Sequence, residues 1–182
     1  MVIVMIMIMI MMLLSSIRVY CNSSSRSRSS SSMFHMRNKY QGRYDFDILK
    51  RSNPNLVTIK NSYNNDDTID YSDANSVRQL NKAILLSHYD NIKYWDIPDG
   101  YLVPPIPSRS DYIHHLNDLI QSSSSSSRSS NNIRGIDIGC GASLIYSLIG
   151  TSEYNWSFVA TDIDQQALAS AKTIIDNNNI NR

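Results

Sequence analysis

The chain has 182 residues, of which 42% are hydrophobic and 18% charged, and its formal net charge at pH 7 is +1. This length is enough to bury the core of one domain, while the nearly balanced charge excludes a basic field over the whole protein. The two cysteines, Cys21 and Cys140, exclude a disulfide framework and indicate a reducing compartment. Cys140 is expected to be a small turn residue, because no partner for a nucleophile is suggested near it.

The amino-terminal tail begins with residues 1–14, which are Met, Ile, Val and Leu without a break. This run is too short to span a bilayer comfortably and lacks the basic leading region of a secretory signal. We interpret residues 1–32 either as a targeting tail or as a gene-model extension upstream of a true start at Met33. The Ser-rich tracts 22–32 and 121–132 have too little apolar surface to offset the entropy of ordering them, so both are predicted to be disordered.

Positive charge is concentrated directly after this tail. Residues 33–60 contain six basic residues against two acidic ones, a local excess of four positive charges. The basic residues are Arg37, Lys39, Arg43, Lys50, Arg51 and Lys60. A basic segment beside a neutral body suits a polyanionic partner, although a solvated surface segment would have the same composition.

Short elements are predicted in the next part of the chain. A helix over 45–52 ends before Asn53-Pro54, because the residue before a proline is disfavoured in the helical region. Strands over 56–59 and 68–71 have strand composition and are separated by a turn-rich stretch. Asp73 is a good N-cap for a helix that runs to about residue 88.

A proline-rich connection follows. The prolines of residues 104–107 predict an extended and rigid segment. Ser108 or Ser110 is then expected to cap a helix whose apolar residues recur at helical spacing. Its predicted inner face consists of Ile113, Leu116, Leu119 and Ile120.

The carboxyl-terminal part alternates between strand and helix patterns. Strands are predicted over 133–138 and 157–161, and helices over about 143–150 and 165–177, the last of them capped by Asp164. Strand, helix, strand, helix in this order implies parallel strands in a doubly wound α/β sheet. Two strands are fewer than a stable open sheet of this type normally has, so only part of such a sheet is expected.

A glycine turn between these strands carries the strongest functional signal. Gly139 and Gly141 follow the first strand, where such sheets bind ligands, and they let the backbone turn sharply beside a ligand. The third glycine of the dinucleotide fingerprint is replaced by Leu144, which favours S-adenosylmethionine over NAD. Asp162 ends the second strand and can accept hydrogen bonds from two ribose hydroxyls. A plainer interpretation stays open, in which the glycines only form a turn and Asp137 only orders the loop.

The chain resembles the RlmF and methyltransferase-like 16 family of RNA adenine-N6 methyltransferases in several long and unusual stretches. These stretches are 34–46, 94–102, 104–114 and 134–139. The sequence Trp-Asp-Ile-Pro-Asp-Gly-Tyr from Trp95 to Tyr101 resembles the family's bacterial ribosomal RNA branch more closely than its spliceosomal RNA branch. The resemblance spans about residues 33–180.

The resemblance implies a partial Rossmann-like class I S-adenosylmethionine-dependent methyltransferase fold of the α/β class, with only its first strands present. An α+β amino-terminal region that binds RNA would precede it. In the implied cofactor site, Arg109 pairs with the carboxylate of S-adenosyl-L-methionine, because a guanidinium binds a carboxylate through two parallel hydrogen bonds. Gly139 and Gly141 would form the cofactor loop, and Asp162 would bind the ribose.

The resemblance also implies that Arg37, Lys39 and Arg43 contact RNA, whereas His114 and His115 inherit no role. The expected domains are a tail over 1–32, an RNA-binding and cofactor-supporting region over 33–120, a linker over 121–132 and a truncated methyltransferase domain over 133–182. The expected partner is a structured ribosomal or small nuclear RNA, such as U6 spliceosomal RNA, with neither a metal ion nor a stable membrane association.

The family's catalytic motif, Asn-Pro-Pro-Phe, does not occur in the 182 residues. In the family, its Asn side chain and a backbone carbonyl would accept hydrogen bonds from the adenine amino group, while its aromatic ring stacks on the flipped base. We therefore expect an RNA (adenine-N6)-methyltransferase that is truncated before its catalytic motif. The 182-residue chain is expected to be inactive. Two alternatives stay open, a non-catalytic RNA-binding fragment and a nicotinamide-dependent oxidoreductase fragment. Localisation stays open between nucleus, cytoplasm, mitochondrion and plastid.

Overall fold

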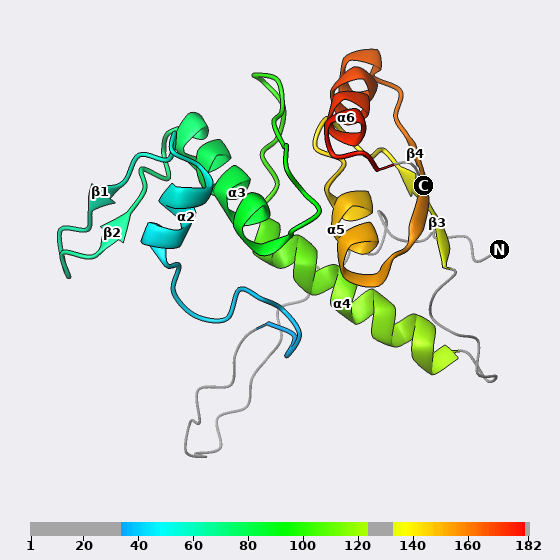
Figure 1. The fold of residues 1–182 in the computed structure, drawn as a ribbon, viewed down its shortest axis with the longest axis horizontal. Coiled ribbons are helices and arrows are strands. Elements are labelled where there is room, and N and C mark those ends of the chain that lie inside the picture. The colour runs from blue at the N-terminus through cyan, green and yellow to red at the C-terminus, as the bar shows by residue number, and fades with distance from the viewer. Residues whose placement is uncertain (1–33, 124–132, 181–182) are drawn as a thin grey trace, which may run out of the picture.

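The computed structural model describes residues 34–123 and 133–180 (Figure 1). Its helices and strands follow one another as α2 Phe46–Ser52, β1 Ile59–Lys60, β2 Asp67–Thr68, α3 Ala74–His88, α4 Ile106–Ser123, β3 Arg134–Ile138, α5 Ile145–Tyr154, β4 Ser157–Thr161 and α6 Gln165–Asn177. The predicted tail over 1–32 lies outside the described residues. Most of the predicted linker over 121–132 does too, although α4 extends three residues into it.

Two helices have the bounds that their caps predict. The Asp73 side chain accepts backbone N–H groups of the first turn of α3, and the Asp164 side chain does the same for α6. Each carboxylate thereby satisfies donors that have no partner within the helix. The Asp45 side chain caps the shorter helix α2 in the same way.

The start of α4 differs from its prediction. The helix was expected to begin after Ser108 or Ser110, but it begins at Ile106. The side-chain oxygen of Asn81 on α3 accepts the Ile106 N–H at 3.0 Å, so the first turn of α4 is capped by a neighbouring helix. The prediction that Leu119 faces inward was also wrong, since this residue is 62% exposed.

The strands β1 and β2 form an antiparallel hairpin with two residues in each strand. The predicted strands over 56–59 and 68–71 lie further from the turn than the observed ones. Hydrogen bonding within the turn explains the shift, because the Asn61 N–H donates to the Asp66 carbonyl at 2.9 Å and extends the pairing toward the tip. The existence of the hairpin was therefore predictable, whereas its register was not.

The strands β3 and β4 pair in parallel, as predicted. Both helices that follow them, α5 and α6, lie on the same side of this pair (Figure 1). The Phe158 ring of β4 packs so closely against α5 that a Cβ on Gly150 would lie 2.8 Å from it, so this helix position requires glycine. α5 continues to Tyr154, beyond its predicted end at about residue 150.

The opposite face of the β3–β4 pair carries exposed apolar side chains. Ile136 is 44% exposed, Ile138 50% and Val159 63%. These residues alternate along the strands, so they lie on the face that α5 and α6 do not cover. Helices on both faces are typical of a parallel sheet, and within 34–123 and 133–180 only one face has them.

Candidate functional site

The glycine loop, residues 139–144, connects β3 to α5 with an unusual backbone. Gly139 and Gly141 have φ angles of +75° and +62°. The N–H groups of Gly139 and Cys140 donate to the Thr161 carbonyl at 2.8 and 3.0 Å, which ties the loop to the end of β4. A Cβ on either glycine would meet nothing within 4 Å, so the space above the loop is open. These glycines serve the backbone turn and leave room for a ligand.

The start of α5 is capped by a residue of the preceding strand. Its N-cap is Leu144, which has a φ of +51° and provides no side-chain hydrogen bond to the first turn. The Asp137 carboxylate of β3 accepts hydrogen bonds from both the hydroxyl and the backbone of Ser147, in the first turn of α5. This end of the helix therefore has an acceptor within the protein. In α3 and α6, by contrast, the capping carboxylate belongs to the residue directly before the helix.

Asp162 lies across from the loop and is held in a fixed orientation. The Gly141 N–H donates to its Oδ2 atom at 2.8 Å, and the Asp164 N–H donates to its Oδ1 atom at 3.0 Å. The Asp164 and Gly141 hydrogen bonds lower the pKa of the Asp162 carboxyl, so it is ionised at neutral pH. A carboxylate has about four acceptor positions, so it can accept further donors beside the backbone N–H groups that orient it. The binding of two ribose hydroxyls by Asp162 stays a prediction.

Arg109 reaches the same region from α4. Its guanidinium carbon lies 5.6 Å from the centre of the Tyr146 ring, which is in the first turn of α5. The pKa of the Tyr146 hydroxyl is raised mainly by burial, and it is also influenced by the charges of Arg109 and Asp137. Arg109 therefore borders the α5 end of the glycine loop. Among the described residues no carboxylate pairs with its guanidinium, which leaves it able to bind a ligand carboxylate.

Two residues near the loop have structural roles. Asp137 accepts a hydrogen bond from the Ser147 hydroxyl at 2.8 Å and so joins β3 to α5. Burial raises the pKa of the Asp137 carboxyl above its ordinary value, and the Ser147 hydrogen bond opposes this effect. Burial also raises the pKa of the Cys140 thiol to about 11, so this thiol is protonated at neutral pH and is a small turn residue, as expected.

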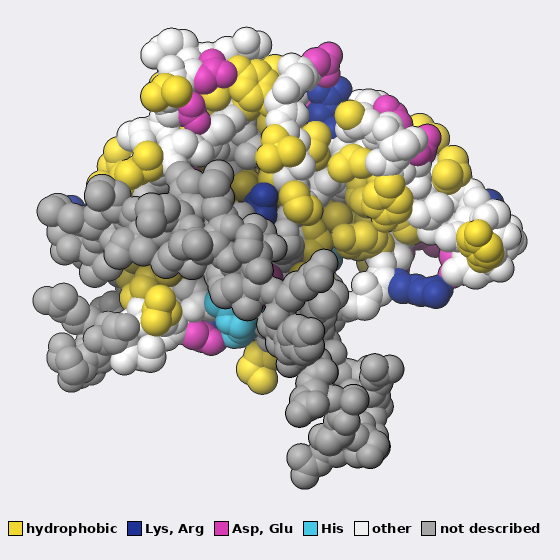
Figure 2. Space-filling model, turned by 180° about the vertical axis from the view of Figure 1, so that it is seen from behind, with side chains coloured by type: hydrophobic (Ala, Val, Ile, Leu, Met, Phe, Trp, Pro, Cys, Tyr) yellow, Lys and Arg dark blue, Asp and Glu magenta, His cyan; other side chains and the backbone are white. Residues whose placement is uncertain are grey.

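The predicted RNA-binding residues lie away from the loop and are paired within the chain. Arg37 pairs with Asp118 of α4, and Lys39 pairs with Glu153 of α5 at 3.0 Å. Arg43 pairs with Asp66 in the hairpin turn and is the most exposed of the three, with 81% of its side chain accessible. The local excess of charge in the sequence is thus offset by distant carboxylates. On the face that Figure 2 shows, basic side chains are separate from one another and interspersed with acidic ones.

The strap, residues 93–101, supports the loop. The sequence placed it in the cofactor-supporting region over 33–120 but assigned no site role to any of its residues. The Trp95 indole N–H donates to the Ser143 carbonyl at 3.0 Å. The Tyr101 hydroxyl donates to the Asp164 carboxylate at 2.5 Å, next to Asp162. The unusual amino-acid sequence of this stretch was the only signal. Its contact with a loop 48 positions away could not be inferred, because such a long-range contact produces no periodic pattern in the sequence.

The candidate site is an open surface and not an enclosed pocket. Ile163, between the two carboxylates, is 99% exposed. A hollow of about 380 Å³ lies between the strap and α6, but neither the glycine loop nor Asp162 lines it. No group of three or more metal-binding side chains occurs in residues 34–123 and 133–180. None of the helices in these ranges is long and apolar enough to cross a membrane.

A parallel strand–helix–strand–helix unit with a glycine turn and a carboxylate at its strand ends defines a nucleotide-cofactor-binding α/β protein. Comparison with known protein families identifies the family within this class. A family model described as RNA methyltransferase matches residues 28–182, and the chain belongs to this family. The resemblance to RlmF and methyltransferase-like 16 proteins is therefore confirmed.

Solved structures of human METTL16 are similar to this chain. Its N-terminal domain matches with a TM-score of 0.72 and 35% identity over 82% of this chain and 56% of that one. The same domain in complex with SAH has a TM-score of 0.71 and 35% identity, over 81% and 56% of the two chains. The catalytic domain in complex with MAT2A 3'UTR hairpin 6 has a TM-score of 0.70 and 33% identity, over 82% and 51%.

Relatives in bacteria are also similar. Ribosomal RNA large subunit methyltransferase F of Psychrobacter sp. (strain PRwf-1) is 50% identical over 150 residues, which are 81% of this chain and 45% of the relative. The protein of the same name from Desulfotalea psychrophila is 48% identical over 147 residues, or 80% of this chain and 47% of the relative. The chain thus spans about half the length of the relatives it matches.

Proposed function

We propose that this chain binds S-adenosyl-L-methionine and supplies the cofactor-binding part of an RNA (adenine-N6)-methyltransferase. The observation that carries the proposal is the fixed and ionised Asp162 carboxylate, which Gly141 of the loop holds at 2.8 Å. When bound, the cofactor supplies an electrophilic methyl group on a sulfonium centre. A methyltransferase of this family requires such a donor.

Each predicted site residue has a distinct task in this proposal. The free lone pairs of Asp162 accept the two ribose hydroxyls, and Gly139 and Gly141 let the backbone approach the rest of the ligand. Arg109 pairs with the ligand carboxylate, since no described carboxylate of the protein occupies it. Ile163 offers an exposed apolar surface beside the ribose position, which suits the face of a purine.

Methyl transfer to adenine N6 requires a hydrogen-bond acceptor for the amino group. The resemblance implies that Asn-Pro-Pro-Phe provides this acceptor, and the motif is not in the 182 residues. We therefore expect these residues to bind the donor without transferring its methyl group. With the motif supplied, binding and orientation would provide most of the rate enhancement, because the flipped adenine N6 must approach the methyl group in line.

The proposed partner is a structured RNA, either ribosomal or small nuclear. The relatives named for ribosomal RNA and the RNA complexes of human METTL16 support this choice. Within the chain, Arg43 is the best candidate contact, because its side chain is exposed and its one ion pair lies at the surface. Arg37 and Lys39 would have to exchange partly buried partners for phosphates.

Calorimetric titration tests the cofactor proposal. S-adenosylhomocysteine should bind the purified chain with one-site stoichiometry, whereas NAD should bind at least about tenfold more weakly, because the loop lacks the third glycine that a pyrophosphate needs. A preference for NAD would contradict the proposal and favour an oxidoreductase.

A paired RNA experiment tests the rest of the proposal. Transfer of label from radioactive S-adenosylmethionine to structured RNA is measured beside an electrophoretic mobility shift. RNA binding without transfer by the 182 residues, and transfer once an Asn-Pro-Pro-Phe segment is restored, is the expected result. Binding with no transfer after restoration would instead support a non-catalytic RNA-binding protein.

A further inference from the structure

The glycine loop contains a residue in an unfavourable backbone conformation. Leu144 has a φ of +51°, where the Cβ of a residue other than glycine comes close to its own backbone. Leu144 is also 3% exposed, and its side chain packs in the hydrophobic core. Such a conformation persists only when surrounding contacts fix it. The contacts that hold the last part of the loop therefore decide whether it keeps its shape.

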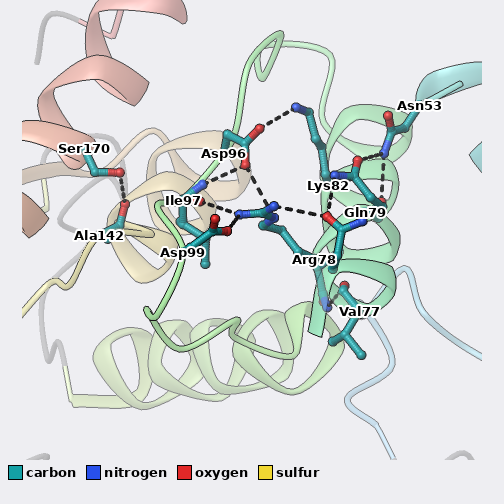
Figure 3. A network of polar contacts seen from close by, with 12 residues as sticks. Asn53, Val77, Arg78, Gln79, Lys82, Asp96, Ile97, Asp99, Ala142 and Ser170 are labelled. Atoms are coloured by element: carbon teal, nitrogen blue, oxygen red, sulfur yellow. Dashed lines mark hydrogen bonds and ion pairs between the residues drawn. The ribbon is translucent and has the colours of Figure 1, made fainter. Parts of the chain in front are cut away.

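Two hydrogen bonds from distant segments hold this part of the loop. The Ser170 hydroxyl of α6 donates to the Ala142 carbonyl at 3.0 Å, as Figure 3 shows. The Trp95 indole N–H of the strap donates to the next carbonyl, that of Ser143, also at 3.0 Å. Ser143 directly precedes Leu144, so the Trp95 hydrogen bond fixes the peptide that leads into the unfavourable position.

The strap itself is firmly attached on its α3 side. Figure 3 shows Arg78 and Lys82 of α3 pointing toward the strap residues after Trp95. Lys82 donates to the Asp96 carboxylate at 2.9 Å, and Arg78 donates to the Ile97 carbonyl at 3.0 Å. Trp95 is 0% exposed and therefore cannot change its rotamer without moving the core.

The strap is also attached to the strand–helix unit. The side-chain oxygen of Asn178, at the end of α6, accepts the backbone N–H groups of Lys93 and Tyr94 at 2.6 and 2.9 Å. The indole is thus held between α3 and α6 before any ligand binds. An N–H group fixed in this way can orient the loop in advance, which lowers the cost of ordering it when a ligand arrives.

We propose that Trp95 is a positioning residue for the methyl-donor site. Its indole N–H holds the Ser143 carbonyl and thereby fixes the glycine loop. This inference rests on the proposed function. It assigns a task to the Trp-Asp-Ile-Pro-Asp-Gly-Tyr stretch, which connects the amino-terminal region to the cofactor loop. Trp95 touches no ligand atom in this proposal and acts only through the loop.

A second tryptophan provides a matched control. Trp156 is likewise buried, at 2% exposed, and packs against Tyr154 and Phe158. Its indole N–H has no hydrogen-bond partner among the described residues. Trp95→Phe and Trp156→Phe therefore remove the same atoms from the core, but only Trp95→Phe removes a hydrogen bond to the loop.

The test compares both variants with the wild-type chain in two measurements. Amide hydrogen exchange of residues 139–146 without ligand reports the shape of the loop. Calorimetric titration with S-adenosylhomocysteine reports the site. Trp95→Phe should speed exchange in the loop and raise the Kd about fivefold to tenfold, the effect of one lost hydrogen bond. Trp156→Phe should leave both quantities within about twofold of wild type, even if its melting temperature falls.

Replacement of Trp95 by benzothienylalanine separates the hydrogen bond from packing, because sulfur replaces the N–H in a ring of nearly the same shape. This variant should behave as Trp95→Phe does. Wild-type exchange and affinity in it, or equal effects of the two Phe variants, would overturn the inference. If the wild-type chain binds no S-adenosylhomocysteine, the proposed function fails, and the exchange comparison still decides the role of Trp95.

Discussion

Two backbone N–H groups determine where the oxygens of the Asp162 carboxylate point. Those hydrogen bonds, from Asp164 first and from Gly141, lower its pKa and keep it an acceptor on both oxygens. An amide at this position would turn an N–H₂ group toward one of these N–H donors. A substitution that neutralises Asp162 therefore disturbs the loop, and we expect it to weaken ligand binding as well.

We predict that Asp162→Asn weakens S-adenosylhomocysteine binding about tenfold to hundredfold, the range for a lost hydrogen bond to a charged group. Isothermal calorimetry measures the effect. Asp176→Asn is the control, since Asp176 is an exposed residue of α6 whose partner is Lys172. Equal affinities of the two variants would show that Asp162 does not bind the ligand.

Arg109 is expected to recognise one part of the ligand only. We predict that Arg109→Ala raises the Kd for S-adenosylhomocysteine about tenfold or more, because a charged hydrogen-bond partner of the carboxylate is lost. The Kd for methylthioadenosine, which lacks the amino-acid carboxylate, should not change. A parallel loss for both ligands would mean that Arg109 acts on the fold and not on the carboxylate.

At the scale of elements, the amino-terminal segment is held on α4 and α5 by a connected polar network. His35 and Arg37 both pair with Asp118, which lowers the pKa of that carboxyl to about 2, with Arg37 as the main cause. The buried His114 ring contacts the Tyr154 hydroxyl at 2.6 Å, and the same hydroxyl accepts from Arg37 at 3.0 Å. The network includes two titratable groups with lowered pKa values, Asp118 and His114.

Burial lowers the pKa of His114 below its ordinary value of 6.5, while Glu153 and Asp111 oppose and His35 and Arg37 reinforce this shift. The unfolded chain then binds a proton at a higher pH than the folded one. The free energy of unfolding should therefore be constant above about pH 6.5 and fall as the pH drops below it.

Urea unfolding between pH 8 and pH 5 checks this prediction. The decline in midpoint should be smaller in His114→Gln, which cannot titrate. His115→Gln is the control, since the neighbouring His115 side chain is 64% exposed. A wild-type decline that His114→Gln leaves unchanged would contradict the assignment. Asp118 acts only in a lower range, because its stabilising contribution is lost as the pH falls from about 4 to about 2.

Elements governed by local contacts were predictable from the sequence, and those governed by distant partners were not. Asp73 and Asp164 cap their own helices, so α3 and α6 could be placed at residue level. α4 begins at Ile106 because Asn81 caps it from another helix, which no local pattern reveals. The proximity of the glycine loop and Asp162 was predictable for a related reason, since each follows one of two parallel strands.

The charge of the amino-terminal segment shows the opposite case. Arg37 and Lys39 suggested a free basic arm, but their partners Asp118 and Glu153 lie far along the chain. A charge count over a stretch of sequence includes only residues that are neighbours along the chain. The electrostatic interaction between two charges depends on their distance in space. Trp95 was missed for the same reason, because its donor role depends on a carbonyl brought close only by the fold.

In the whole molecule, the exposed face of the β3–β4 pair is the surface that we expect to promote self-association. Ile136, Ile138 and Val159 form an apolar surface at the edge of a small sheet, a combination that favours self-association. We predict that the 182-residue chain associates at concentrations above about 10 μM, the range at which exposed apolar surface drives association. Sedimentation velocity would detect it.

Val159→Lys should reduce this association without changing the fold, because the side chain is mostly exposed. Leu102→Lys is the control, since Leu102 is 80% exposed but belongs to the connection before α4. A fully monomeric wild-type chain would show that the apolar face is not a contact surface.

We expect Asp162, the glycine loop and Arg109 to hold one methyl-donor molecule between them. A crystal structure of the chain with S-adenosylhomocysteine tests it most directly. Both ribose hydroxyls should lie within about 3.2 Å of the Asp162 oxygens, with the ligand carboxylate paired to Arg109. A ligand bound elsewhere, or one whose carboxylate points away from Arg109 while its ribose leaves Asp162 free, would show that these residues do not form the donor site.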